Sequence, residues 1–216
     1  ALEGATDLSG AIAEAAAPAW LDAQAKTPEW DLFLLSDGAI TWGDSELYNI
    51  SKSLDSGRAG ALFAYQTGLS GTDVRMLGHL ARETGGAVFS VVGEDEIAKA
   101  AVAHRSRPWQ IAGVELPGGT DLMLAGRPEN IYPDQQLMLV GRGTPDVREA
   151  EIVLHVTRAG RQETVVTQLS HSIDSDLAVR SYGQVAVGQL EDLSAATEDF
   201  SKAYATHFRV TGQTCS

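Results

Sequence analysis

Short, unbroken runs of apolar residues alternate with segments of helical periodicity through the first hundred residues. The clearest run is Leu32-Phe33-Leu34-Leu35, which ends at Ser36-Asp37-Gly38. A run of this length bounded by turn residues is typical of a strand that is buried on both faces of a parallel sheet. In open α/β sheets ligands bind at the carboxyl ends of the strands, so Asp37 is expected at the ligand-binding end.

Two further buried strands are predicted at residues 60–66 and 87–93, and helical segments precede, separate and follow the strands. One helix is predicted within residues 2–24, after a cap at Thr6 or Asp7, and the others cover residues 45–56, 73–84 and 94–105. In the last of them the spacing places Ile97, Ala101 and Val102 on the inward face. Alternating helices and short apolar strands predict an α/β fold with a partial doubly wound parallel sheet over residues 1–106.

The pattern changes after residue 106. Short apolar segments separated by turns rich in glycine and proline predict an antiparallel, β-sandwich-like region over residues 107–170. Two helices are then predicted at 177–193 and 197–209. They make residues 171–216 a helical C-terminal segment that packs on the β-rich region.

Composition narrows the possible functions. The chain has 216 residues, a net charge of −13 and a pI of about 4.7, so phosphate backbones would repel it and a nucleic-acid role is disfavoured. No segment approaches the ~18 to 20 apolar residues that cross a bilayer, and a soluble protein is expected. The single cysteine, Cys215, cannot form an internal disulfide or a cysteine-rich metal site.

Two loops give a more specific indication. Glu3-Gly4-Ala5-Thr6-Asp7, a helix and a strand ending in Ser36-Asp37-Gly38 together resemble the second half of a von Willebrand factor A domain. That family holds a divalent cation in a metal-ion-dependent adhesion site, which is built from an Asp-x-Ser-x-Ser loop, a threonine loop and a Thr/Ser-Asp-Gly loop. By this resemblance Thr6 matches the second loop and Asp37 the third.

The first loop of that motif is absent from the chain, so the resemblance implies an incomplete site. Oxygen ligands suit Mg²⁺, which the resemblance assigns, or another divalent cation, to the full-length protein. The alternative is that Thr6 or Asp7 caps a helix. Asp37 would then only stabilise a turn.

A downstream segment adds to the resemblance. Tyr132-Pro133-Asp134-Gln135-Gln136 and the apolar strand that follows resemble the region after the A domain in inter-alpha-trypsin inhibitor heavy chains and their bacterial relatives. The resemblance implies that this chain is a fragment beginning inside an A domain, and that the protein is extracytoplasmic.

The leading functional hypothesis is a non-catalytic, adhesion-type module that binds a protein partner. Trp42 and Ser36 lie on the predicted ligand face, where we expect them to contact that partner. One alternative is a structural scaffold without a ligand. Another is a hydrolase of unknown substrate that uses Ser36 or Ser70, although neither serine lies in a Gly-x-Ser-x-Gly motif.

The resemblance also has a consequence for the strand at residues 31–36. In an A domain the matching strand is central and pairs with a first strand that this chain lacks. Its free N–H and C=O groups would then form an exposed edge, and such edges recruit other strands. We therefore expect residues 31–36 to be covered by another chain, either in a homodimer or by a retained N-terminal fragment.

Overall fold

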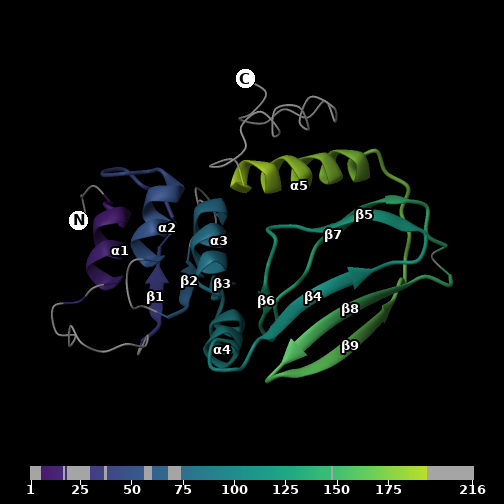
Figure 1. Ribbon diagram of the computed structural model, residues 1–216, viewed down its shortest axis with the longest axis horizontal. Coiled ribbons are helices and arrows are strands. Elements are labelled where there is room, and N and C mark those ends of the chain that lie inside the picture. The colour runs from purple at the N-terminus through teal and green to yellow at the C-terminus, as the bar shows by residue number, and fades with distance from the viewer. Residues whose placement is uncertain are drawn as a thin grey trace. The chain divides into compact units, whose positions relative to one another are not determined.

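The computed structural model describes residues 6–16, 18, 30–36, 38–55, 60–67, 74–146 and 148–193. The chain is mixed α/β and forms two compact units (Figure 1). The first unit comprises Ala1–Arg107 together with Tyr132–Gln135. The second comprises Pro108–Ile131 and Gln136–Ser216.

The first unit contains a three-stranded parallel sheet in the order β1-β2-β3. The strands are β1 (Leu32–Leu35), β2 (Leu62–Gln66) and β3 (Ala87–Ser90). The helices are α1 (Leu8–Ala16), α2 (Leu47–Asp55), α3 (Val74–Glu83) and α4 (Glu94–Ala103). The predicted alternation of helices and strands is confirmed, although most of these elements are shorter than predicted.

Helices lie on both faces of this sheet. One core contains buried residues of α1, α2 and α3 together with Leu62 and Ala64 of β2. The other contains Phe63 and Phe89 from the strands with Ala100 from α4. Because alternate residues of a strand point to opposite faces, β2 contributes to both cores and is the buried centre of the sheet.

The prediction that the strand at residues 31–36 is buried on both faces is wrong. Leu32 and Leu34 are partly buried against the core of α1 to α3, whereas Phe33 is 52% exposed and Leu35 is 70% exposed. The cause is the position of β1, which among the described strands pairs with β2 alone and therefore lies at one end of the described sheet. A run of four apolar residues does not by itself distinguish a central strand from an edge strand.

The inward face of α4 also differs from the prediction. Ile97 is 52% exposed, Val102 is 58% exposed and Ala101 is exposed. Ala100 and Ala103 are buried instead. These two small residues pack in the same core as the aromatic side chains of β2 and β3. A short side chain lets the helix approach a surface that the rings already fill, so helical spacing alone selected the wrong face.

Residues 132–135 also belong to the first unit, although the residues on both sides of them belong to the second. Tyr132 packs edge-on against Phe63 and Phe89, with ring centroids 5.5 and 6.0 Å apart. Its hydroxyl donates a hydrogen bond to the carbonyl of Gly85 at 3.3 Å, and the amide of Gln135 donates one to the carbonyl of Val88 at 3.2 Å. Residues 132–135 therefore contact the first part of β3 and the turn before it.

The second unit consists of antiparallel strands and one described helix. One sheet has the order β6-β4-β8-β9 and the other pairs β5 with β7. The strands are β4 (Trp109–Glu115), β5 (Gly119–Leu124), β6 (Asn130–Ile131), β7 (Leu139–Gly143), β8 (Glu151–Arg158) and β9 (Arg161–Gln168). The helix α5 (Leu177–Leu193) agrees with the prediction for residues 177–193, whereas the helix predicted at 197–209 lies outside the described residues.

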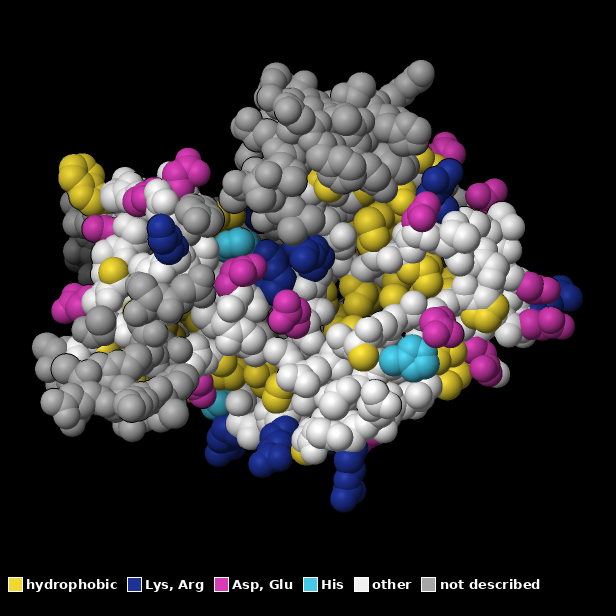
Figure 2. All heavy atoms as spheres, viewed as in Figure 1, with side chains coloured by type: hydrophobic (Ala, Val, Ile, Leu, Met, Phe, Trp, Pro, Cys, Tyr) yellow, Lys and Arg dark blue, Asp and Glu magenta, His cyan; other side chains and the backbone are white. Residues whose placement is uncertain are grey.

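Helix α5 contacts β5 and β7. Tyr182, Ala186 and Val187 on its inner face are buried, and the side-chain amide of Gln189 donates a 2.7 Å hydrogen bond to the carbonyl of Leu124. Most apolar side chains of β4 and β5 are only partly buried. Hydrophobic side chains are accordingly visible between β4 and the pair β5 and β7 in the space-filling view (Figure 2).

Candidate functional site

The loop at the carboxyl end of β1 begins with a tight turn. Gly38 has a φ of +78°, which favours glycine, and its N–H donates a 3.0 Å hydrogen bond to the hydroxyl oxygen of Ser36. Ser36 is partly exposed. Asp37, the central residue of the predicted metal site, lies outside the described residues.

Thr6 is joined directly to this loop by three hydrogen bonds. Its N–H donates to the hydroxyl of Thr41 at 2.6 Å, and its carbonyl accepts from the N–H groups of Thr41 and Trp42, both at 3.2 Å. The segment that precedes α1 is therefore fixed against the loop that follows β1. The structure thus places Thr6 beside the loop that contains Asp37.

Asp7 is the residue that caps α1. Its carboxylate accepts a 2.8 Å hydrogen bond from the N–H of Gly10 and another of 2.8 Å from the hydroxyl of Ser9. These bonds, the backbone bond first, lower the pKa of the Asp7 carboxyl below its usual value of 3.8. Gly43 approaches this carboxylate so closely, with a φ of +81°, that a side chain there would meet it at 2.5 Å.

Acid should reduce the stability that the Asp7 carboxylate contributes at the start of α1. Because the folded-state pKa of Asp7 lies below 3.8, its stabilisation is complete above that value and is lost as the pH falls through the lower one. In Asp7→Asn the capping oxygen remains but the charge is gone. Urea unfolding from about pH 7 down to about pH 2 should show the two proteins converging in stability at the acid end. A constant difference across that range would mean that the charge of Asp7 is not the stabilising feature.

The carboxylate of Asp44, in the loop that follows β1, is also engaged in hydrogen bonds. Asp44 accepts hydrogen bonds from the N–H of Glu46 at 2.9 Å and from the side-chain amide of Asn49 at 2.7 Å, so it organises the start of α2. Within the described part of the chain no cluster of three or more His, Cys, Asp or Glu residues could hold a metal ion. The oxygen donors described here are of the type that Mg²⁺ prefers, but among the described residues they are too few for a closed site.

Trp42 follows the same loop and is 68% exposed. Its backbone is fixed by the hydrogen bond to Thr6, and the positive φ of Gly43 turns the chain directly after it. The loop therefore presents a large aromatic side chain to solvent next to Thr6. An exposed tryptophan on a fixed backbone is a common anchor in protein interfaces.

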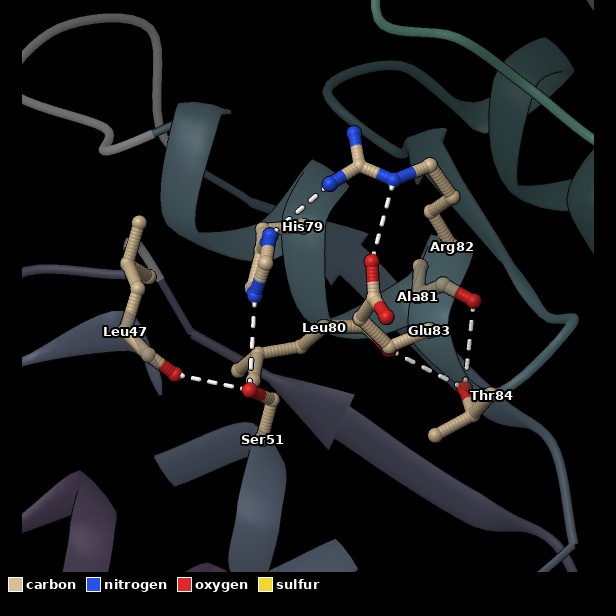
Figure 3. Close-up of polar contacts among 8 residues, drawn as sticks. All are labelled: Leu47, Ser51, His79, Leu80, Ala81, Arg82, Glu83 and Thr84. Atoms are coloured by element: carbon tan, nitrogen blue, oxygen red, sulfur yellow. Dashed lines mark hydrogen bonds and ion pairs between the residues drawn. The ribbon is translucent and has the colours of Figure 1, made fainter. Parts of the chain in front are cut away.

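A second polar cluster joins α2 to α3 and is shown in Figure 3. The hydroxyl of Ser51 donates to the carbonyl of Leu47 at 3.0 Å, so its oxygen accepts from Nε2 of His79 at 3.4 Å. The remaining ring nitrogen, Nδ1, then accepts a 2.8 Å hydrogen bond from Arg82. These contacts require a neutral imidazole with its proton on Nε2.

This cluster lacks the charge arrangement of a serine hydrolase. There a carboxylate accepts from Nδ1–H and stabilises the imidazolium, whereas here a guanidinium group occupies that side of His79. Ser51 is also almost completely buried. His79 and Arg82 lie one turn apart on α3, which the sequence shows, but the approach of Ser51 depends on the packing of two helices.

The serines considered from the sequence give no further support for a nucleophile. The hydrogen bond to Ser36 comes from a backbone N–H, and none of the described histidines bonds to it. Ser70 lies outside the described residues.

Neither a comparison with protein-family models nor one with curated proteins found a match to this chain. No helix in the described ranges has the length and apolar character needed to cross a membrane.

Proposed function

We propose that this chain is part of a von Willebrand A-like, non-catalytic module that binds a protein partner. The observation that supports this proposal is the hydrogen-bonded contact of Thr6 with the loop that follows β1. In a parallel sheet that loop lies at the ligand-binding end. The hydrogen bonds of Thr6 with Thr41 and Trp42 thus support a site in which the threonine loop and the loop after β1 come together.

In the full-length protein Thr6 and Asp37 would help to hold Mg²⁺ or another divalent cation, with the remaining ligands supplied from outside this chain. A bound cation would supply an open coordination position for a carboxylate of the partner. Trp42, on the same loop, would then contact the surface around that carboxylate, and Ser36 would lie at the edge of the contact.

Calorimetric titration of the full-length protein with Mg²⁺ and Mn²⁺ tests this assignment. Asp37→Ala should abolish measurable binding and Thr6→Ala should weaken it, whereas Thr6→Ser keeps the hydroxyl and should bind normally. Asp44→Asn is the matched control, because the Asp44 carboxylate already serves the start of α2. The assignment fails if Asp37→Ala binds the metal as well as the unaltered protein does.

A structural role without a ligand is the second candidate, and one observation favours it. The carboxylates of Asp7 and Asp44 are both engaged in hydrogen bonds that stabilise helix starts. Under this alternative Asp44→Asn and Asp37→Ala would both leave metal binding at the background level of the unaltered protein. Specific binding that depends on Asp37 would exclude it.

A further inference from the structure

The hairpin of β8 and β9 in the second unit places two arginines directly opposite each other at its tip (Figure 1). Arg158 ends β8 and Arg161 begins β9, and the two are partners in the antiparallel register. Opposed residues of such a pair point to the same face of the sheet, with Cβ atoms about 4.5–5.5 Å apart. The two guanidinium side chains therefore start side by side.

A tight turn fixes this spacing. Two residues, Ala159 and Gly160, join the strands, and their φ angles are +52° and +77°. Two positive φ angles in succession are typical of the two-residue turns that match the twist of a hairpin. All eight residues of β8 are paired with residues of β9, so the tip is the end of a regular ladder.

Trp109 holds one of the two arginines. Gln110 pairs with Thr157, so Trp109 and Arg158 occupy the next positions on the neighbouring strands β4 and β8. The guanidinium carbon of Arg158 lies over the Trp109 ring, 4.3 Å from its centroid, and the residue is partly buried. This contact uses the flat face of the cation, whereas its N–H donors lie in its plane and stay available to a ligand.

No described group balances the two charges. Neither guanidinium forms an ion pair or a hydrogen bond with a residue that the structure describes. Glu163 lies two residues along the same face of β9, opposite Val156, and bonds neither arginine. Like charges directly opposite each other destabilise a strand pair. In a chain with a net charge of −13, such a cationic pair is explained by a bound anion.

The geometry also indicates the kind of anion. Two planar guanidinium groups side by side can each donate two hydrogen bonds to one group of oxygen atoms. A carboxylate supplies two oxygens and a single charge. A phosphate monoester supplies three acceptor oxygens and about two negative charges near neutral pH. It therefore neutralises both cations and accepts from both.

We propose that Arg158 and Arg161 form a binding site for a phosphate group, free or as a monoester, and that Trp109 holds Arg158 in position for it. The site lies in the second unit and goes beyond the proposed function, because it involves neither a metal ion nor the loop after β1.

Fluorine NMR of the full chain labelled with 5-fluorotryptophan provides the test. Trp109 is the one tryptophan of the second unit, and its signal is assigned from the spectrum of Trp109→Phe. Glycerol 2-phosphate and inorganic phosphate are titrated separately at constant ionic strength. The Trp109 signal should shift saturably, with half-saturation below about 10 mM, and the tighter ligand identifies the ester or the free anion as the source. Acetate should bind about tenfold more weakly, because it carries one charge.

Three variants locate the site. Arg161→Gln should weaken phosphate binding by about tenfold or more, and Arg161→Lys, which keeps the charge but not the planar fork, by a smaller factor. Arg142→Gln is the matched control and should bind normally, because this arginine of the same unit already pairs with Asp121 at 3.3 Å. The proposal is overturned if neither phosphate ligand causes a saturable shift, if acetate binds equally well, or if Arg161→Gln binds phosphate as tightly as the unaltered protein.

Discussion

Gly86→Ala should destabilise the first unit by about 3 kcal/mol or more, the upper end of the usual effect of overpacking. Gly86 lies between α3 and β3, where its N–H donates a 2.8 Å hydrogen bond to the carbonyl of Ala81. A Cβ at this position would overlap the carbonyl oxygen of Leu62 and would lie 2.6 Å from its carbonyl carbon. The obstacle is the backbone of the central strand, so no side chain can move aside to relieve the overlap.

Urea unfolding followed by tryptophan fluorescence measures this effect. A Trp109→Phe background removes the one tryptophan of the second unit, so the signal then reports on the first unit. Gly78→Ala is the matched control, because no atom lies within 4 Å of its new Cβ inside α3. That substitution should instead stabilise the unit by about 0.5–1 kcal/mol, since alanine favours a helix interior. A loss below about 1 kcal/mol for Gly86→Ala would contradict the close approach of Gly86 to β2.

The order of elements in the first unit could be predicted because each strand is a short apolar run bounded by turn residues. The pattern did not predict which strands would be neighbours in the sheet. The run Leu32–Leu35 has the composition of a central strand, yet its exposed face depends on how many strands are present beside it. Similarly, the choice between Ile97 and Ala100 on α4 was decided by the aromatic residues that the sheet already presents.

The candidate site was predictable only in part for a related reason. The loop containing Ser36 was predicted because an apolar run ends there. Thr6 was predicted from the resemblance of its segment to a threonine loop. The contact between Thr6 and Thr41 and the cluster of Ser51 with His79 join residues far apart in the sequence. Such contacts depend on the packing of α1, α2 and α3, which hydrophobic periodicity does not specify.

Leu80→Ala and Leu35→Ala should differ strongly, although each removes the same atoms from a leucine of the first unit. Leu80 is completely buried in the core shared by α1, α2 and α3, so its truncation should destabilise the unit by about 2–5 kcal/mol. Leu35 is 70% exposed on the edge strand, and its truncation should change stability by less than about 0.5 kcal/mol. Urea unfolding in the Trp109→Phe background provides both values.

Two outcomes would contradict this prediction. A loss above about 1 kcal/mol for Leu35→Ala would show that its side chain is covered in the folded protein, and a loss below about 1 kcal/mol for Leu80→Ala would contradict its complete burial in the core.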